Sequence, residues 1–227
     1  MKRVLVIAAH PDDEVLGLGG TIAKLSQNGV QVHLLIVTDG STAQYRDSDD
    51  VAQILRRKKE ETKKAADILG ISSVTYADLP DMQLDTVSHI RLNQVISDEI
   101  EAVCPDTVFT HFAGDINLDH RLVFESTMVA VRPVSDSSVR QVFSYRVPSS
   151  TEWAPACTER AFCPNYFVDI SSQFDQKKAA VLAYQTELRG ELHPRSLRGV
   201  EIADAQIGIT VGVRYAEAFI LVRQIDR

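Results

Sequence analysis

Two short segments of this chain are dense in side chains that bind metals or transfer protons. The first is His-Pro-Asp-Asp-Glu at positions 10–14, and the second spans residues 111–120, with a histidine at each end. His10, Asp13 and His120 would supply two imidazoles and one carboxylate, a donor set that suits zinc and leaves one coordination position open for water. Zinc would lower the pKa of that water toward 7 and polarise a carbonyl group. The spacing predicts a catalytic zinc site, although the same donors also suit iron(II) or cobalt.

Asp12 lies between two of these ligands without being needed as one. The fixed φ of a proline lets the turn direct His10 and Asp13 to one point, which Asp12 faces from the side. A carboxylate there can accept a proton from water as a general base. The alternative interpretation is structural: an aspartate of this turn caps a helix, and the histidines are incidental.

Buried strands alternate with amphipathic helices along the first part of the chain. The expected strands are Val4–Ala9, Val32–Val37, Ser73–Tyr76 and Asp106–His111, and the expected helices are Asp13–Asn28, Val51–Leu69 and Ile90–Val103. This alternation is typical of an α/β, Rossmann-like fold, with a mostly parallel sheet and helices on both faces. Ligands of such sheets bind beyond the carboxyl ends of the strands. Both metal-ligand segments directly follow an expected strand.

The pattern changes in the last third of the chain. It predicts strands at Gln141–Val147, Tyr166–Ile170 and Ala216–Arg223, a helix at Gln173–Leu188, and an irregular loop or lid at Pro148–Pro164. No repeat or low-complexity linker divides the sequence. We therefore expect a single domain of residues 1–227, with a core of about 1–140 and a C-terminal elaboration of about 141–227.

The motifs as a set resemble a known family. The segment 10–14 directly after a first strand, the turn Thr38-Asp39-Gly40 and the later Asp119-His120 pair are similar to the PIG-L/LmbE-like zinc-dependent N-acetylglucosaminyl deacetylases. The likeness is best over about residues 1–131. It implies a Rossmann-like fold and hydrolysis of an acetamide on an amino sugar. It also implies that His10, Asp13 and His120 hold zinc, with Asp12 as the base.

One position departs from the family pattern. Many members have His-Pro-Asp-His at the second segment, whereas this chain has Asn-Leu-Asp-His at 117–120. Asn117 can donate a hydrogen bond to an oxyanion, but it cannot protonate a leaving amine. We expect His193, or Asp12 in its protonated form, to supply that proton, and His111 is a second candidate for the missing histidine. Asp119 would orient the group that acts.

Further polar residues are candidates for substrate binding. Asp39 can accept hydrogen bonds from sugar hydroxyls, and Arg46 or Arg195 can bind a phosphate, a carboxylate or a sugar. Asp115 and His111 complete this set. Each also has a structural interpretation, because aspartates form turns, a histidine can shape a turn, and surface arginines lie in solvent.

Other conspicuous residues are given structural roles. The basic run Arg56–Lys59 is expected to face solvent and pair with neighbouring glutamates along a helix. Gly17, Gly19 and Gly20 are expected to serve close packing, and His33 and His89 have no catalytic context.

The composition of the chain limits the kinds of partner that it is expected to bind. The chain has 227 residues, 44% of them hydrophobic, and 24 basic against 31 acidic residues give a net charge of −7. An acidic chain has no electrostatic footprint for nucleic acid or an anionic membrane, and no apolar stretch approaches the ~20 residues of a membrane span. Small-molecule substrates are therefore expected, with a homo-oligomer left open. The odd cysteine count (Cys104, Cys157 and Cys163) favours free, partly buried thiols in the cytoplasm over a Cys157/Cys163 redox or metal pair.

The leading hypothesis is a metal-dependent hydrolase that removes an N-acetyl or other small N-acyl group from an amino sugar, free or as a nucleotide or glycoconjugate. One alternative is an amidase on a different small amide, such as a thiol conjugate. Another is a non-catalytic, nucleotide-binding Rossmann module with a structural metal site. Release of acetate from N-acetylglucosamine derivatives would support only the first.

Overall fold

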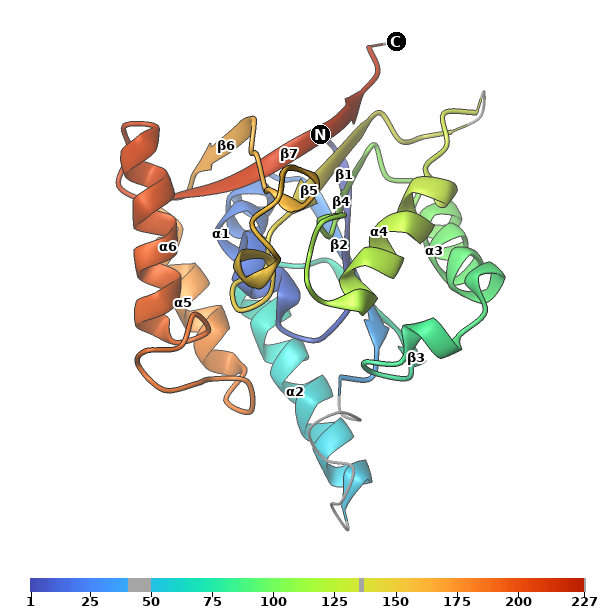
Figure 1. Cartoon of the computed structure of the whole chain (residues 1–227), viewed down its shortest axis with the longest axis horizontal. Coiled ribbons are helices and arrows are strands. Elements are labelled where there is room, and N and C mark those ends of the chain that lie inside the picture. Colours follow the sequence, from blue (N-terminus) through green and yellow to red (C-terminus); the bar gives the residue numbers. More distant parts are fainter. Residues whose placement is uncertain (41–49, 135–136, 227) are drawn as a thin grey trace.

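The computed structural model describes residues 1–40, 50–134 and 137–226, and these form one seven-stranded sheet flanked by helices (Figure 1). The sheet order is β3-β2-β1-β4-β5-β7-β6. Its strands are β1 Arg3–Ala8, β2 Gln31–Thr38, β3 Ser73–Leu79, β4 Thr107–Thr110, β5 Gln141–Tyr145, β6 Tyr166–Asp169 and β7 Ala216–Gln224. The helices are α1 Asp13–Gln27, α2 Val51–Leu69, α3 His89–Val103, α4 Leu118–Ala130, α5 Phe174–Ala183 and α6 Leu197–Thr210.

The first five strands are parallel, and the order reverses between β1 and β4. β1 pairs with β2 on one side and with β4 on the other. The last strand, β7, lies antiparallel between β5 and β6. The carboxyl ends of β1 and β4 are therefore neighbours at a topological switch point, where ligands of open α/β sheets bind. The α/β, Rossmann-like, mostly parallel fold is confirmed.

Both faces of the sheet are covered because successive side chains of the central strands point to opposite sides. Val4, Val6 and Ala8 of β1 pack into the cluster formed with α1, α2 and α5, whereas Leu5 and Ile7 pack into the cluster formed with α3 and α4. Figure 1 shows these helices on either side of the strands, with α6 beside β7. Burial on both faces explains the unbroken apolar run that predicted β1.

Two helices differ from expectation. The helix expected at Gln173–Leu188 ends earlier, at Ala183, and Tyr184 leaves it with φ −85° and ψ 65°. The residues beyond form a hydrogen-bonded turn whose side chains reach the site described below. Helix α6 was not expected, because its two glycines and exposed isoleucines obscure the amphipathic pattern.

Helix α1 bends at Leu18, whose φ of −150° is not helical. Just beyond the bend, the backbone N–H groups of Gly20 and Thr21 donate to the Glu217 carboxylate of β7, at 2.9 and 2.6 Å. The expected close packing of the glycines is confirmed: a Cβ at Gly17 would lie 2.5 Å from the Tyr145 ring. The last strand thus holds the helix that follows the first metal-ligand segment.

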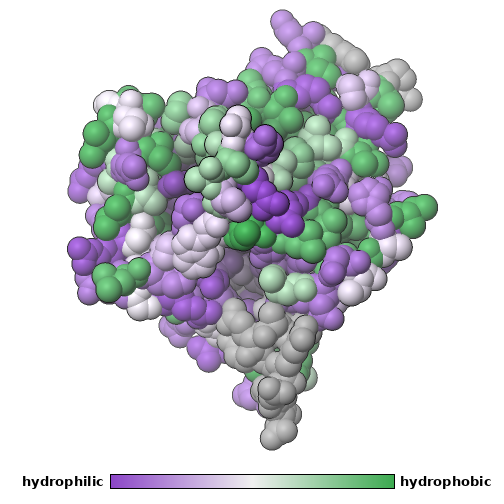
Figure 2. All heavy atoms as spheres, in the orientation of Figure 1, coloured by the Kyte–Doolittle hydropathy of each residue, from purple (hydrophilic) through white to green (hydrophobic). Residues whose placement is uncertain are grey.

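Among the described residues, no helix is long and apolar enough to cross a bilayer. Figure 2 shows hydrophilic and hydrophobic residues mixed over one face. Cys104, Cys157 and Cys163 are free and exposed, not partly buried as expected. Each lies in a loop or at a helix end, outside the packed layers.

Candidate metal centre and active site

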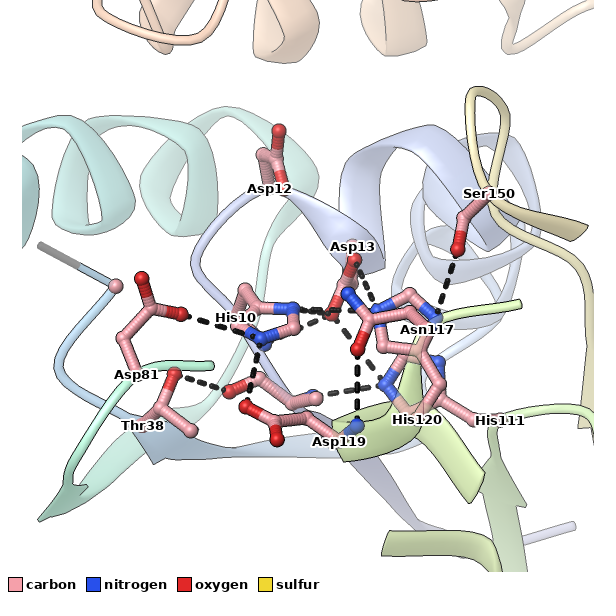
Figure 3. A network of polar contacts seen from close by, with 12 residues as sticks. His10, Asp12, Asp13, Thr38, Asp81, His111, Asn117, Asp119, His120 and Ser150 are labelled. Atoms are coloured by element: carbon pink, nitrogen blue, oxygen red, sulfur yellow. Dashed lines mark hydrogen bonds and ion pairs between the residues drawn. The ribbon is translucent and has the colours of Figure 1, made fainter. Parts of the chain in front are cut away.

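The two polar segments meet at the switch point. The first continues from β1 into the first turn of α1, and the second connects β4 to α4. Because β1 and β4 are paired, the segments leave the sheet side by side. His10, Asp13 and His120 come together from these two connections and point toward one another in Figure 3.

The distances among these three side chains match those expected of metal ligands. His10 Nδ1 lies 3.2 Å from His120 Nε2 and 3.4 Å from Asp13 Oδ2. Asp13 Oδ1 lies 3.5 Å from His120 Nε2. Tetrahedral zinc with bonds of about 2.0–2.1 Å separates its nitrogen and oxygen ligands by about 3.3 Å. The residues present therefore fit a zinc-sized ion.

Each imidazole has at least one carboxylate beside its second ring nitrogen. The Nδ1 atom of His120 lies 3.3 Å from Asp115, and the Nε2 atom of His10 lies 3.3 Å from Asp119 and 3.2 Å from Asp81. Metal-bound histidines commonly donate their second N–H to such a carboxylate, which fixes the tautomer and the ring plane. This second layer supports the assignment of Nδ1 of His10 and Nε2 of His120 as the ligand atoms.

The pKa values indicate a site built for positive charge. Burial lowers the pKa of His120, but the carboxylates of Asp13 and Asp115 outweigh burial and raise it to about 9. Burial raises the pKa of Asp13, but His120 and His111 hold it well below its ordinary value. The carboxylates of Asp13 and Asp115, both close to His120, thus favour a positive charge at this position, either a proton or a metal ion.

His111 lies behind the candidate ligands and is not among the residues that line the cavity. It is fully buried, its ring stacks on His120 at 4.0 Å, and its Nε2 accepts the N–H of Ala9 at 2.8 Å. Burial and the neighbouring charge of His120 lower the pKa of His111 to about 4. It stays neutral at pH 7, which argues against its expected roles as an acid for the leaving amine and as a substrate contact.

A cavity of about 250 Å³ opens beside the three ligands. Its lining includes His10, Pro11, Asp12, Asp13, Leu16, Gly40, Lys58, Asp81, Met82, Asn117, His120, Val147, Ser149, Ser150, Glu187 and Arg195. The candidate metal ligands, three further carboxylates, an amide and two cations thus share one space.

Asp12 stands apart from the ligand cluster in Figure 3 but lines the same cavity. Its carboxylate lies 3.3 Å from Arg195, which also contacts Glu187 at 3.1 Å. Burial, followed by the negative charges of Glu187 and Asp13, raises the pKa of Asp12 well above its ordinary value, against the opposing effect of Arg195 and Lys58. A carboxylate with a raised pKa is suited to proton transfer near neutral pH.

The other expected site residues divide by position. Asn117 and Arg195 line the cavity, whereas Asp115 and Asp119 lie behind the histidines. Asp115 also accepts hydrogen bonds from Ser150 and Thr151, and its pKa is lowered to about 2 because the bond to His120 and these hydroxyls outweigh its burial. Asp115 therefore lies where it can orient the candidate ligand His120, and it is not among the residues that line the cavity.

Two of the expected residues, His193 and Asp39, are not among those that line this cavity. His193 lines a separate cavity, where its ring packs edge-on against Trp153 and its Nδ1 accepts the N–H of Arg195 at 3.1 Å. Asp39 lies next to the cavity residue Gly40, but it is not part of the lining. Arg46 lies outside the described residues.

Several cavity residues were missed by reasoning from the sequence. Lys58 was expected in solvent, but it is 2% exposed and bonds to Glu187 and to the carbonyl of Gly40. Helical periodicity could have found it, because Lys58, Thr62 and Ala65 share the buried face of α2. Glu187 had no such signal, since it lies in a turn where a helix was expected.

Comparisons with known proteins find related sequences and related folds. The family model described as PIG-L, GlcNAc-PI de-N-acetylase, matches residues 5–131. A diacetylchitobiose deacetylase from Thermococcus kodakarensis is 32% identical over 96% of this chain and 82% of its own length. A 4-oxalmesaconate hydratase from Pseudomonas putida is 30% identical over 95% of this chain and 87% of its own length.

Among solved structures, the 4-carboxy-2-hydroxymuconate hydratase from Pseudomonas putida matches with a TM-score of 0.82 and 23% identity, covering 100% of this chain and 98% of that one. At this identity the match speaks for the fold alone. The family match covers more than half of the chain, and it spans β1, α1, β4 and α4, the four elements that carry the ligand set. The chain belongs to the PIG-L family.

Proposed function

We propose that this protein is a zinc-dependent deacetylase that removes an acetyl group from the nitrogen of an amino sugar. The observation that carries the proposal is the convergence of His10, Asp13 and His120 within 4.8 Å of one another beside a cavity that Asp12 also lines. Family membership and the 32% identical diacetylchitobiose deacetylase support the amide chemistry and the sugar.

The residues divide the chemistry among them. Zinc, when bound, supplies a Lewis acid that activates water and polarises the amide carbonyl. Asp12 accepts the proton of the attacking water and returns it to the leaving nitrogen, so that a single carboxyl group serves as base and acid. Asn117, which lines the cavity, can donate a hydrogen bond to the developing oxyanion.

The cavity also suggests what the rest of the substrate contacts. Arg195 and Asn117 can bind sugar hydroxyls, and the carbonyl of Gly40 is already held by Lys58. We no longer assign His193 a role in proton transfer, because it lies in another cavity. The odd number of cysteines supports a cytoplasmic location.

The direct test is Asp12→Asn, which keeps the shape of the side chain but cannot accept a proton. We expect zinc to bind as before and kcat on N-acetylglucosamine derivatives to fall by roughly 10²–10⁴-fold, the usual contribution of general acid–base catalysis. Acetate release and zinc content would be measured together. Asp67→Asn, on the exposed face of α2, is the matched control. Wild-type turnover by Asp12→Asn would exclude Asp12 as the base, and full activity after chelation would exclude the metal mechanism.

A second candidate is hydration of an unsaturated carboxylic acid. The observation in its favour is the 30% identity to a hydratase over 95% of this chain, together with the Arg195 guanidinium in the cavity, which could bind a carboxylate. The two activities give different products. A new primary amine and acetate identify the deacetylase, whereas loss of ultraviolet absorbance from a conjugated acid, without amine release, identifies the hydratase.

A further inference from the structure

The backbone of Asp12 is strained. Its φ of 108° and ψ of −23° lie in a region that residues other than glycine rarely occupy, and its exposed fraction is 5%. Such a conformation costs about 1–3 kcal/mol and persists only where the surroundings hold it. The structure shows two separate sets of contacts to Asp12, one to its backbone and one to its carboxylate.

The first set holds the backbone. The N–H of Asp12 donates to Glu14 Oε2 at 3.2 Å, and the hydroxyl of Tyr184 donates to Glu14 Oε1 at 2.5 Å. Glu14 is fully buried and Tyr184 is 1% exposed. Both oxygens of the Glu14 carboxylate are therefore engaged, one by the strained residue and the other by a tyrosine from the C-terminal part of the chain.

The second set holds the carboxylate. Arg195 lies 3.3 Å from Asp12 Oδ2 and 3.1 Å from Glu187 Oε2, and Glu187 is in turn bonded to the buried ammonium of Lys58. Glu187 thus bridges two cations, and one of them faces Asp12. This contact fixes where the carboxylate of Asp12 points.

Each set of contacts includes one side chain from the same turn. Tyr184 and Glu187 lie at the ends of the turn that follows α5, where the N–H of Glu187 donates to the carbonyl of Tyr184 at 3.0 Å. The helix ends at Ala183, and this allows the two side chains to diverge toward Glu14 and Lys58.

We propose that the turn Tyr184–Glu187 positions Asp12, holding its strained backbone through Glu14 and its carboxylate through Arg195. This inference rests on the proposed function, in which Asp12 is the base. Tyr184, Glu14 and Glu187 are positioning residues, because they act through Asp12 and the turn itself supplies no metal ligand. Removal of one contact should let the turn at Asp12 relax and move the carboxylate away from its productive position.

Tyr184→Phe and Glu14→Gln test the backbone set with little change of volume. The phenylalanine cannot donate to Glu14, and the glutamine presents one acceptor where two are needed. We expect each to lower kcat about tenfold, with KM and zinc affinity changed less than about twofold, since a lost buried hydrogen bond is worth roughly tenfold in rate. Tyr215→Phe is the matched control, because Tyr215 donates to Glu201 at 2.8 Å in another part of the fold.

A double-mutant comparison separates positioning from mere stability. If Tyr184 acts through Asp12, then Tyr184→Phe should not lower the residual kcat of Asp12→Asn any further. A further tenfold loss in that background would overturn the proposal, as would a Tyr184→Phe enzyme with wild-type kcat. Failure of the proposed function would look different, because Asp12→Asn alone would then keep its rate.

Discussion

Asn117 shows how one side chain can serve both the fold and the site. Its Oδ1 accepts the N–H of Asp119 at 2.9 Å and caps α4, while its Nδ2 lies 3.4 Å from the sulfur of Met82 at the cavity wall. Aspartate and asparagine are both good caps, but only the amide can donate a hydrogen bond. The two functions can therefore be separated by substitution.

Asn117→Asp should keep the cap and lose the donor, whereas Asn117→Ala should lose both. We expect Asn117→Asp to unfold within about 0.5 kcal/mol of wild type and Asn117→Ala to be about 1 kcal/mol less stable. Both should lower kcat about tenfold or more if the amide stabilises the oxyanion. Urea unfolding and acetate release would be compared on the same preparations. Full activity in Asn117→Asp would restrict Asn117 to capping.

At the residue scale, the sequence predicted the candidate metal ligands better than the residues that surround them. His10, Asp13 and His120 converge as expected, because their spacing after two adjacent strands leaves them little freedom. Contacts between distant segments were not predictable in the same way: Lys58 and Glu187 meet only because α2 and the turn after α5 pack together. Nothing local in the sequence records such a pair.

Among the elements, the amino ends of β1 and β4 are joined by one side chain. Asp106 accepts the backbone N–H groups of Lys2 and Arg3 at 2.6 and 3.2 Å, and the hydroxyl of Thr107 at 2.7 Å. Burial raises the pKa of Asp106, but these hydrogen bonds outweigh it and hold the pKa below its ordinary value. The pair of strands that carries the site is thus fixed at its opposite end by a carboxylate.

A carboxyl group whose pKa is lower in the folded than in the unfolded protein stabilises the fold when the pH is above the pKa of the unfolded state. That stability is lost as the pH falls through the pKa of the folded state. Asp106→Asn should therefore destabilise the protein by about 1 kcal/mol at pH 7. The difference from wild type should shrink as the pH falls below about 4. Unfolding midpoints in urea from pH 7 to pH 3 would measure it, with Asp67→Asn as the exposed control. A pH-independent difference would contradict the assignment.

Helix ends were the least predictable feature of the elements. The apolar pattern continues past Ala183, yet α5 stops there because Tyr184 and Glu187 are held by side chains of α1 and α2. The strands of the sheet core were predicted closely, since burial on both faces leaves unbroken apolar runs. Tertiary contacts decide the helix boundary in a way that a local pattern cannot record.

Over the whole molecule, two of the proposed metal ligands lie on helices that cover opposite faces of the sheet. Asp13 begins α1, and His120 lies in the first turn of α4. The unfolded chain has no such arrangement, so an ion bound there stabilises the folded protein alone. We propose that all 227 residues form one domain, since strands of the C-terminal part complete the same sheet.

Zinc should accordingly raise the melting temperature. At a thousandfold excess over its Kd, zinc adds about 4 kcal/mol of stability, or roughly 10 °C for a chain of this size. His120→Asn should abolish most of this shift, whereas His89→Asn, at an exposed position, should preserve it. Calorimetry with and without a chelator gives both numbers. An unchanged shift in His120→Asn would place the ion elsewhere.

The position of β7 has a consequence for the order in which the protein assembles. β6 is hydrogen-bonded to the sheet through β7, which lies after it in the sequence, while the three proposed metal ligands precede β5. A nascent chain can thus gather its metal ligands long before Tyr184, Arg195 and Glu217 are synthesised. On the proposed function, metal capture and catalytic competence would be separated in time, with the chain first able to bind a metal ion and only later able to use it.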